Sequence, residues 1–505
     1  MSVAARTFRA IMWSAGGSAA QAVLGVVSLA IMARALGASS FGVYGVAITA
    51  IAFADMLVGS VLPDAIRQRE TLEARHVDAT FWASLIFSLV FGAVIALFAA
   101  PIAVFFRAPP DAAPVFIAVT ALLPLSALAA TPLALLSREL NYGAIARVET
   151  IASLCSIATG APLALMGAGV WSLVAMELTR RSVRLVLAYA ARPWRPGFAG
   201  GAKAFLEMAK FNGQTLAVYG FGFLDVAVAP FLIARLLGVE ALGIYGAGRR
   251  VLESLTGAVV GPFTSVILSS AARLQNDRAA LAALLASLYR ASGLIAYPAF
   301  LGLAALAPVA VPLAFGEKWV GAVLPMQILM LIGLRTATGA FNAGVLRGVD
   351  KSHLMLILLA LGVVLQIVLV PLGALYGVVG ICAAMVARTW ATWPLGAWFI
   401  KRETGLSMKA QADAGASAIP AAIGMALAIS LIVARAPPLP LLAGFILYAA
   451  LGAIIYLALL AVLAPSLLRE ALAIGKAILR RDSGALARGL QPAGEPLIAA
   501  RAPAS

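Results

Sequence analysis

The feature that most constrains this chain is a succession of apolar stretches, each long enough to cross a bilayer. A helix needs about 20 apolar residues to span roughly 30 Å of hydrocarbon. None of the stretches shows the alternation with period two that a membrane barrel strand requires, so helices are expected throughout. We predict fourteen spans, at residues 8–33, 42–63, 80–106, 112–136, 148–166, 169–191, 211–234, 241–268, 289–315, 320–346, 354–372, 376–399, 416–434 and 440–464.

Composition supports the same class. Hydrophobic residues make up 63% of the chain and charged residues 11%, whereas soluble domains hold about 45–50% apolar and roughly 25% charged residues. A chain this apolar cannot bury its side chains in a water-soluble core, so lipid is its solvent. We therefore expect an all-α, polytopic integral membrane protein. The stretch at 8–33 is too long for the hydrophobic region of a signal peptide and is expected to be the first span.

Lysine and arginine predict the orientation of the spans. With the spans above, 25 of the 37 basic residues fall in loops and termini on the side of the N-terminus. Only five fall on the other side, and seven lie within spans. Because cytoplasmic loops collect basic residues, both termini are expected in the cytoplasm. The outer loops are about ten residues or shorter, which argues against a large external catalytic domain. The five outer basic residues are Arg34, Arg107, Arg235, Lys318 and Arg435.

An internal repeat indicates two related halves. Residues 33–45 are ARALGASSFGVYG and residues 234–246 are ARLLGVEALGIYG, which agree at seven of thirteen positions. Both copies follow an odd-numbered span, so the halves have the same topology, as in transporters with a substrate site between two bundles. The alternative is a chance match in sequence rich in Ala, Leu and Gly. A second echo matches Gly169, Val170, Ala175 and Arg180 with Gly377, Val378, Ala383 and Arg388.

The repeat predicts a domain organisation. We expect an N-lobe of six helices at residues 1–205 and a C-lobe of six helices at 206–402. Two further helices occupy 403–466, and a cytoplasmic tail follows at 467–505. The beginning of that tail, at 467–481, has the composition of a basic amphipathic helix that could lie on anionic headgroups. Rocking of one lobe against the other predicts alternating access.

Charged residues within the spans mark the candidate site. Arginine inside a membrane is costly, so it usually faces a cavity or a partner. The alternative is that Glu177 and Glu253 neutralise neighbouring arginines while the others extend toward the interface. The surplus of positive charge predicts an anionic ligand, and a guanidinium suits a phosphate because it donates two parallel hydrogen bonds. The seven arginines are Arg180, Arg181, Arg184, Arg249, Arg250, Arg335 and Arg388.

Helical spacing predicts different roles for the neighbouring residues Arg249 and Arg250. Arg249 lies four residues before Glu253 and is expected to pair with it, which leaves Arg250 for the anion. Tyr245 lies on the same face as Arg249. Asn342 continues a polar stripe that begins at Arg335. The predicted residues for binding a diphosphate or glycan are Arg249, Arg250, Arg181, Arg180, Arg335, Arg388, Tyr245 and Asn342.

Two aspartates within spans leave two alternatives open. Asp55 and Asp225 could bind a proton or sodium ion and couple its gradient to transport, or could pair with arginines across the interface between lobes. No other cofactor is expected, no metal site has the necessary residue spacing, and no catalytic residues are predicted. Cys155 and Cys382 are expected to have packing roles.

Nucleic acid is not an expected partner, because the net charge of +16 is not gathered into a basic stripe. The remaining ionisable candidates are two histidines. Both His76 and His353 are expected to be solvated in cytoplasmic loops.

The motifs together resemble the polysaccharide exporter, or oligosaccharide flippase, family of the multidrug/oligosaccharidyl-lipid/polysaccharide superfamily. The resemblance covers about residues 8–400. It is carried by the repeated R-x-L-G-x-x-x-x-G-x-Y-G, by Tyr245, Arg249, Arg250 and Leu255, by residues 274–278 (LQNDR), and by residues 315–319 (FGEKW) ahead of Pro325 and Leu329. One departure is Ala229, where the family often has an acidic residue, so no family role is transferred to Asp225.

The resemblance implies a bacterial inner-membrane protein with two six-helix lobes around a central cavity. It implies transport of an undecaprenyl-diphosphate-linked oligosaccharide, with Arg249 and Arg250 placed to bind the diphosphate. Its implied partners are that substrate, membrane lipids, and polysaccharide polymerase and assembly proteins.

Two other functions compete with this hypothesis. A cation-coupled multidrug antiporter of the same superfamily needs an acidic or aromatic cavity, which the seven arginines argue against. A membrane glycan polymerase or ligase typically presents a long external loop with catalytic residues, and the outer loops here are short.

Overall fold

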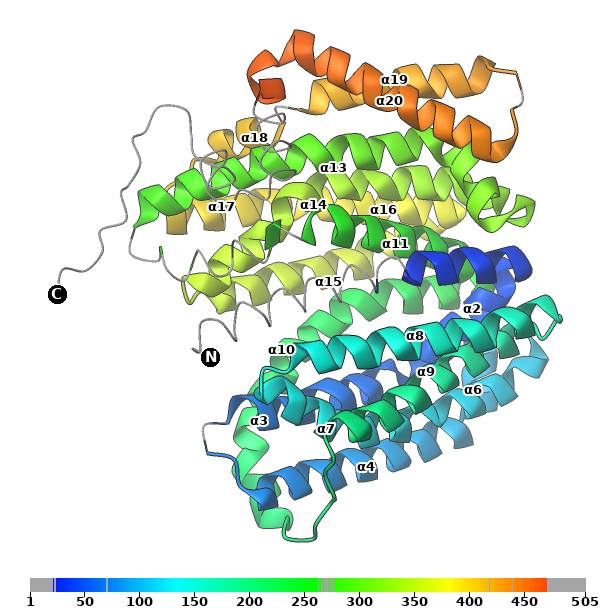
Figure 1. The fold of residues 1–505 in the computed structure, drawn as a ribbon, viewed down its shortest axis with the longest axis vertical. Coiled ribbons are helices and arrows are strands. Elements are labelled where there is room, and N and C mark those ends of the chain that lie inside the picture. The colour runs from blue at the N-terminus through cyan, green and yellow to red at the C-terminus, as the bar shows by residue number, and fades with distance from the viewer. Residues whose placement is uncertain are drawn as a thin grey trace. The chain divides into compact units, whose positions relative to one another are not determined.

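A computed structural model describes residues 21, 24–69, 71–261, 263–264, 267, 271, 274, 277–416, 418–437 and 439–469, without the side chains of 68, 202 and 208–218. The start of the first predicted span, part of the 274–278 motif and the tail from 470 lie outside the described residues. Every regular element among the described residues is a helix, as expected for an all-α membrane protein. Figure 1 shows them as long rods.

After a short apolar helix at Leu24–Ala35, the helices follow in the order of the predicted spans. They are α2 (Ala38–Met56), a π-helical turn η1 (Leu57–Val61), α3 (Leu62–Gln68), α4 (Ala74–Leu97), α5 (Ala99–Phe105), η2 (Pro110–Ala112), α6 (Ala113–Thr120), α7 (Leu122–Arg138), α8 (Tyr142–Leu165), α9 (Val170–Ala191), α10 (Ala202–Leu237), α11 (Val239–Val259), α13 (Arg278–Phe315), η3 (Glu317–Ala322), α14 (Val323–Gly348), α15 (Ser352–Ala374), α16 (Gly377–Ala391), α17 (Trp393–Thr404), α18 (Met408–Ala416), α19 (Ile419–Arg435) and α20 (Leu441–Leu463).

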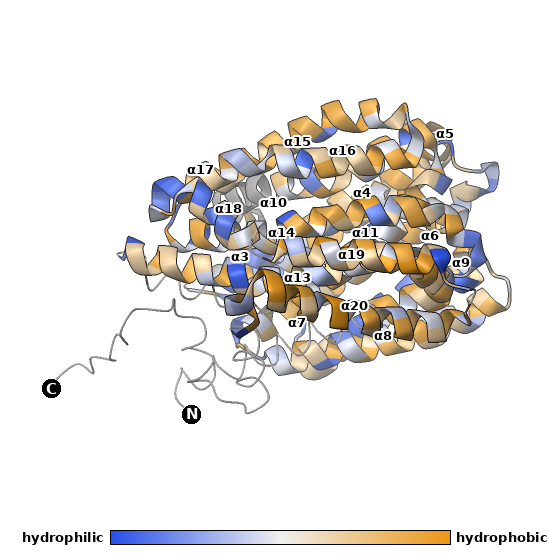
Figure 2. Cartoon of the chain, turned by 90° about the horizontal axis from the view of Figure 1, so that it is seen from above, coloured by the Kyte–Doolittle hydropathy of each residue, from blue (hydrophilic) through white to orange (hydrophobic). Residues whose placement is uncertain are grey.

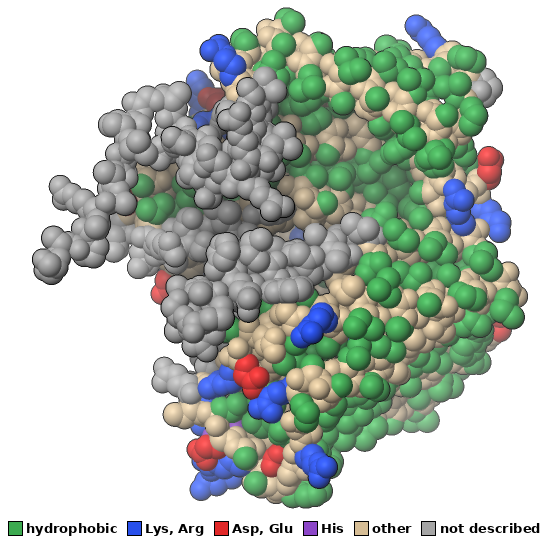
Figure 3. Space-filling model, viewed as in Figure 1, with side chains coloured by type: hydrophobic (Ala, Val, Ile, Leu, Met, Phe, Trp, Pro, Cys, Tyr) green, Lys and Arg blue, Asp and Glu red, His purple; other side chains and the backbone are tan. Residues whose placement is uncertain are grey.

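The spans are compatible with the fourteen predicted. Within the described residues, eleven helices are long and apolar enough to cross a membrane. The three further predicted spans are the first, which is described only in part, and α9 and α11. These two have 22 and 21 residues, which is long enough, but they carry the charged residues discussed below. Figure 2 shows the apolar helices with hydrophilic residues gathered near their ends, and Figure 3 shows a face made mostly of hydrophobic side chains.

Two helices start at least nine residues before the spans predicted for them. The spans expected at 211–234 and 289–315 belong to α10, with 36 residues, and α13, with 38 residues. Each extends into a segment that lies outside the predicted spans. Residues 202–210 and 278–288 are rich in Ala, Leu, Lys and Arg and contain no Pro or Gly, so nothing in them ends a helix.

The chain forms two compact units. Unit 1 comprises residues 1–258, 307–329 and 356–389, and unit 2 comprises 259–306, 330–355 and 390–505. In unit 1, α8 and α9 pack along each other, and α7 packs on both α4 and α9 (Figure 1). In unit 2, α19 and α20 form an antiparallel pair. The hydroxyl of Tyr456 on α20 donates a 2.9 Å hydrogen bond to the carbonyl of Leu294 on α13.

Within unit 1, the repeated motif forms a crossing of α2 and α11. Gly37 and Gly238 immediately precede the two helices, and Gly238 has φ +87°, which favours glycine. A Cβ at Gly42 would lie 1.7 Å from the carbonyl oxygen of Val239, and a Cβ at Gly243 would lie 2.0 Å from that of Ala38. These two contacts are equivalent, because matching residues in the two copies of the repeat are 201 positions apart. The matching glycines therefore allow the starts of α2 and α11 to touch through their backbones.

The FGEKW motif packs against the first copy of the repeat. The indole Nε1 of Trp319, which is 1% exposed, donates to the carbonyls of Ala33 at 2.8 Å and Leu36 at 3.3 Å. Its ring makes edge contacts with Phe41 and Phe315. The two copies of the repeat and the FGEKW motif, which are far apart in the sequence, thus lie together in unit 1.

Candidate anion-binding site

Five of the seven arginines within the predicted spans have a carboxylate partner in the structure. The paired residues are Arg180, Arg181, Arg184, Arg249 and Arg388, and their partners are Glu177, Asp55, Glu149, Glu253 and Asp225. Over the described part of the chain, Arg250 and Arg335 have no carboxylate within 4.0 Å. Five positive charges are thus balanced by five negative charges, and the surplus that the sequence predicts is concentrated at two residues.

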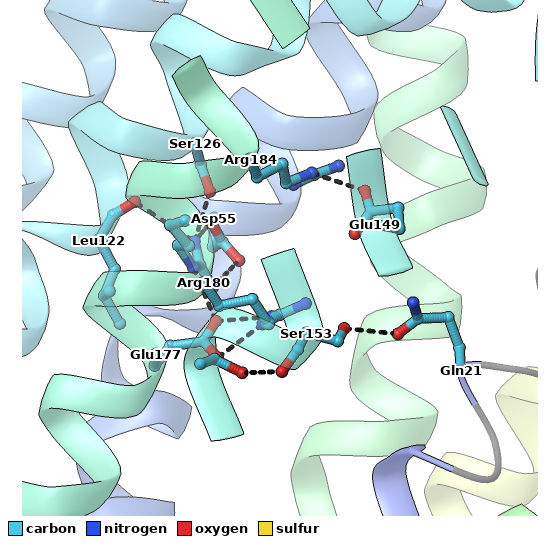
Figure 4. Close-up of polar contacts among 11 residues, drawn as sticks. Gln21, Asp55, Leu122, Ser126, Glu149, Ser153, Glu177, Arg180 and Arg184 are labelled. Carbon is cyan, nitrogen blue, oxygen red and sulfur yellow. Dashed lines mark hydrogen bonds and ion pairs between the residues drawn. The ribbon is translucent and has the colours of Figure 1, made fainter. Parts of the chain in front are cut away.

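The largest ion-pair network lies on α9 and is shown in Figure 4. Arg181, whose side chain is 10% exposed, donates to Asp55 on α2 at 2.5 Å and to Glu177 at 2.9 Å. It also donates to the hydroxyl of Ser126 on α7. Glu177 is shared, because Arg180 binds it at 2.6 Å. A guanidinium with this many partners fixes three helices together. Asp55 lies one residue before the end of α2, just ahead of the π-helical turn.

The third arginine of α9 has a partner that sequence analysis missed. Arg184 forms a 2.7 Å ion pair with Glu149 on α8, and Figure 4 shows the two side chains pointing toward each other. Glu149 is the second residue of the predicted span at 148–166. Its position inside a span could have marked it as a possible partner for an arginine. The alternative in which Glu177 and Glu253 neutralise neighbouring arginines therefore omitted Glu149.

Asp225 belongs to a second network, which is partly buried. It pairs with Arg388 on α16, and the side-chain amide of Gln366 on α15 donates to its backbone carbonyl at 2.9 Å and to its Oδ1 at 3.3 Å. Gln366 is fully buried and was not predicted. Asp55 and Asp225 therefore both pair with arginine, but not across the two predicted lobes. Each pair joins two helices of the same predicted lobe, because the partners belong to spans two and six or to spans seven and twelve.

On α11, the predicted pairing of Arg249 with Glu253 is confirmed. Arg249 pairs with Glu253 at 2.7 Å, as the i,i+4 spacing requires. Arg250 is exposed and has no hydrogen bond or ion pair to any other described residue. Tyr245, which is 2% exposed, lies beside Arg249 and interacts with it electrostatically.

The first tyrosine of the repeat connects Arg250 with the α9 network. Tyr44 is buried on α2, and its hydroxyl interacts electrostatically with Glu177, Arg180, Arg181 and Arg250. Arg180 keeps 36% of its side-chain surface exposed. Arg250, which is exposed and has no ion pair among the described residues, and the partly exposed Arg180 thus both act on the charge of Tyr44 within unit 1. Exposed guanidinium groups of this kind attract anions. Tyr44 was recognised in the repeat but was not predicted to belong to the site.

The two other predicted residues lie together in unit 2. Asn342 is buried on α14 and accepts a hydrogen bond from the hydroxyl of Tyr289 on α13. Arg335, two turns earlier on α14, interacts electrostatically with Tyr289 and Tyr297. The candidate residues therefore divide between the units: Arg335 and Asn342 lie in unit 2, and the rest lie in unit 1.

One histidine differs from the expectation. His76 lies in the first turn of α4 and is fully buried rather than solvated. Its Nδ1 accepts from the backbone N–H of Glu73 at 3.2 Å, so the proton is on Nε2, which faces Glu207 of α10 at 3.2 Å. This hydrogen bond lowers the pKa of Glu207. His353 is exposed in the first turn of α15. Across the described residues, no group of three or more His, Cys, Asp or Glu side chains has the geometry of a metal site.

Comparison with known proteins identifies the family. Residues 31–324 match the family model described as polysaccharide biosynthesis protein. The chain belongs to this family. It is 28% identical over 354 residues to the succinoglycan biosynthesis transport protein ExoT of Rhizobium meliloti (strain 1021), covering 69% of this chain and 70% of that protein. It is 26% identical over 351 residues to the lipopolysaccharide biosynthesis protein WzxC of Escherichia coli (strain K12), covering 67% and 69%.

A solved structure supports the fold. The lipid II flippase MurJ, in an inward closed conformation, matches with a TM-score of 0.74, covering 90% of this chain and 99% of MurJ at 12% sequence identity. The chain is thus a multi-pass membrane protein of the polysaccharide biosynthesis family with a MurJ-like fold, and the family resemblance drawn from the motifs is confirmed.

Proposed function

We propose that this protein transports an oligosaccharide linked to a lipid diphosphate, of the undecaprenyl type, across the bacterial cytoplasmic membrane. The observation that carries the proposal is Arg250, which is exposed and has no ion pair within the described part of the chain, in a member of the polysaccharide biosynthesis family. A diphosphate cannot cross hydrocarbon unaided because moving its charge out of water is very costly. A polar, positively charged path through the protein lowers this cost while the prenyl chain stays in lipid.

In this proposal, Arg250 binds the diphosphate first. It has no internal carboxylate to release, whereas Arg249 must break its bond to Glu253. Arg180 is the second donor, because it is partly exposed and shares Glu177 with Arg181. Arg181 and Arg388 are held by ion pairs with Asp55 and Asp225 and serve mainly to position their helices.

The crossing of α2 and α11 supports alternating access. According to the predicted topology the two helices start at the outer surface, so their contact closes the protein on that side. The substrate then enters from the cytoplasm and leaves when this crossing separates. Backbone contact through glycine is suited to such a gate, since small residues let two helices approach closely. A disulfide between cysteines at Gly45 and Leu242, whose side-chain positions face each other, should block transport until it is reduced. The variant should also replace Cys155 and Cys382 with Ser.

The orientation is part of the proposal, with both termini and residues 192–210 in the cytoplasm. A single cysteine in place of Lys203 should react with a membrane-impermeant maleimide only after the cells are opened. Labelling of that cysteine in intact cells would reverse the topology.

The transport proposal is tested with purified protein in vesicles that contain a fluorescent undecaprenyl-diphosphate oligosaccharide. Leaflet exchange is measured as accessibility to an impermeant quencher. Arg250→Gln should reduce the rate about tenfold or more, since one charge-assisted bidentate contact is lost. Arg250→Lys should recover part of it, because an ammonium lacks the planar fork. The matched control is Arg402→Gln, which removes an arginine whose side chain is 64% exposed.

Full activity of Arg250→Gln would place the anion site elsewhere. The same assay separates the competing functions, because an antiporter would instead move a drug against a proton or sodium gradient and a polymerase would lengthen the glycan. Coupling to such a gradient through Asp55 or Asp225 is a separate prediction, and it requires each carboxylate to leave its arginine.

A further inference from the structure

Between α9 and α10, the linker at residues 192–201 is fixed against the start of α4 within unit 1. The backbone N–H of Gly197 donates to the carboxylate of Asp78 at 3.0 Å, and the indole Nε1 of Trp82 donates to the carbonyl of Gly197 at 2.9 Å. A Cβ at Gly200 would lie 2.2 Å from a backbone nitrogen of α4. The linker is therefore held in one position on α4 by backbone contacts and hydrogen bonds.

The start of this linker and the end of α9 line an open pocket of about 450 Å³. Its lining residues are Tyr189, Pro193, Trp194 and Arg195. The ring of Trp194 packs edge-on against Phe81 of α4, with ring centroids 5.2 Å apart, which fixes the indole in place. A pocket of this size with aromatic walls and a few polar groups is typical of a binding site for a small organic group.

The polar groups of the pocket are unused within the described part of the chain. The hydroxyl of Tyr189, the indole N–H of Trp194 and the guanidinium of Arg195 form no hydrogen bond or ion pair with another described residue. All three can donate a hydrogen bond, and the exposed Arg195 also carries a positive charge. Three donors around one cation match a phosphate group, whose oxygens accept and whose charge a guanidinium binds through two parallel N–H groups.

The charge of the linker also favours an anion. From residue 192 to residue 206 the sequence contains Arg192, Arg195 and Lys203 but no acidic residue. Arg192 pairs with Glu139 at 2.8 Å, whereas Arg195 and Lys203 are exposed and have no ion pair among the described residues. Basic residues directly beside the end of a membrane span attract anionic lipid headgroups.

The neighbouring side chains indicate that the phosphate belongs to a lipid. Val186 lies three residues before Tyr189, on the same face of α9, and is 66% exposed. Phe198 on the linker is 86% exposed. Exposed apolar groups fit acyl chains, and Trp and Tyr prefer the level of the headgroups. The order of an apolar residue, two aromatic residues and then Arg195 thus follows the order of acyl chain, glycerol and phosphate in a phospholipid.

We propose that this pocket binds the headgroup of an anionic phospholipid in the leaflet that the linker faces, which the predicted topology makes the cytoplasmic one. Arg195 contacts the phosphate, while Tyr189 and Trp194 donate to the glycerol and ester oxygens. The bound lipid then holds the junction of α9 and α10 at the membrane surface. This inference is independent of the proposed transport, because it uses none of the residues assigned to the transported substrate.

The test measures lipid binding to the purified protein by native mass spectrometry, which counts individual bound lipids, with phosphatidylglycerol and phosphatidylcholine as probes. The wild-type protein should bind one phosphatidylglycerol about fivefold more tightly than phosphatidylcholine. Arg195→Gln should abolish this preference, and Arg195→Lys should keep part of it because an ammonium lacks the planar fork. Tyr189→Phe removes only a hydroxyl and should weaken phosphatidylglycerol binding about threefold.

Lys203→Gln is the matched control, because it removes the same charge from the start of α10 without altering the lining of the pocket. It should leave the bound phosphatidylglycerol in place. A loss equal to that of Arg195→Gln would show that the basic segment attracts lipid without a defined site, and unchanged binding in Arg195→Gln would overturn the inference as well.

Two competitors identify the source of the phosphate. Displacement of the bound lipid by glycerol 3-phosphate would make the ligand a soluble phosphate compound, and the inference would be wrong. It would also be wrong if undecaprenyl diphosphate displaced the bound lipid at a lower concentration than phosphatidylglycerol itself, because the pocket would then serve the transported substrate. Neither measurement involves transport, so a failure here leaves the proposed function intact.

Discussion

The α9 network and the two unpaired arginines show how differently similar residues are used. Arg181 on α9 is almost buried and has two carboxylates and a hydroxyl as partners, whereas Arg250 on α11 is exposed and has no partner among the described residues. Both are arginines in the middle of a span and both have a glutamate on the same helix. A buried pair is costly to break but does not attract a substrate, while an unpaired cation stays attractive to an anion. The number of arginines therefore overstates the positive charge available for binding.

The contrast between a structural Arg181 and a substrate-binding Arg250 fails if Arg181 can be replaced without loss of stability. Arg181→Gln leaves Asp55 and Glu177 without their shared partner, and the loss of one member of a buried pair costs roughly 3–5 kcal/mol. We expect the lower end, because Asp55 keeps 29% of its side-chain surface exposed. The measurement is thermal unfolding in detergent together with the yield of folded protein. Arg250→Gln serves as the comparison and should unfold at the wild-type temperature. Equal stability of both variants would remove the structural role of the α9 network.

The glycine crossing sharpens the comparison, because it lies at the starts of α2 and α11, whereas Asp55 of the α9 network lies near the end of α2. Gly243→Ala places a methyl group against the carbonyl of Ala38, so α2 and α11 must separate near their starts. Transport should fall several-fold while thermal stability changes by about 1 kcal/mol, the size of a small packing defect. Gly42→Ala should behave alike, since the repeat makes the two positions equivalent. Gly246→Ala is the matched control on the same helix, because a Cβ there meets nothing within 4 Å. A control as impaired as Gly243→Ala would rule out the crossing as the cause.

The smallest effect is expected at the exposed pair of α11. The side chain of Glu253 is 58% exposed, so its bond with Arg249 is worth at most about 1 kcal/mol. Arg249→Gln and Glu253→Gln should each change the transport rate about twofold, by altering the charge next to Arg250. The double variant should be milder than either single one, because it restores the charge balance. A double variant whose loss equals the sum of the two single losses would show that the residues act independently.

Spacing within one helix was sufficient to predict part of the site. The Arg249–Glu253 pair follows from a four-residue separation, and Glu177 lies three and four residues before its two arginines. Long-range partners were not predictable in this way. Asp55 and Arg181 are 126 residues apart, and Asp225 and Arg388 are 163 apart. Sequence analysis left pairing and ion coupling as alternatives for both aspartates, and it expected pairing between lobes.

The sequence by itself determined the class of protein, because apolar length and the absence of period-two alternation leave only membrane helices. It also determined the family and the existence of a repeat, since both are properties of residue order. Only the tertiary structure decided what the repeat does, by bringing Gly42 to Val239 and Gly243 to Ala38. Only the tertiary structure decided which arginines remain unpaired. The reason is that the cost of a charge depends on neighbours contributed by other helices, and one sequence does not state which helices those are.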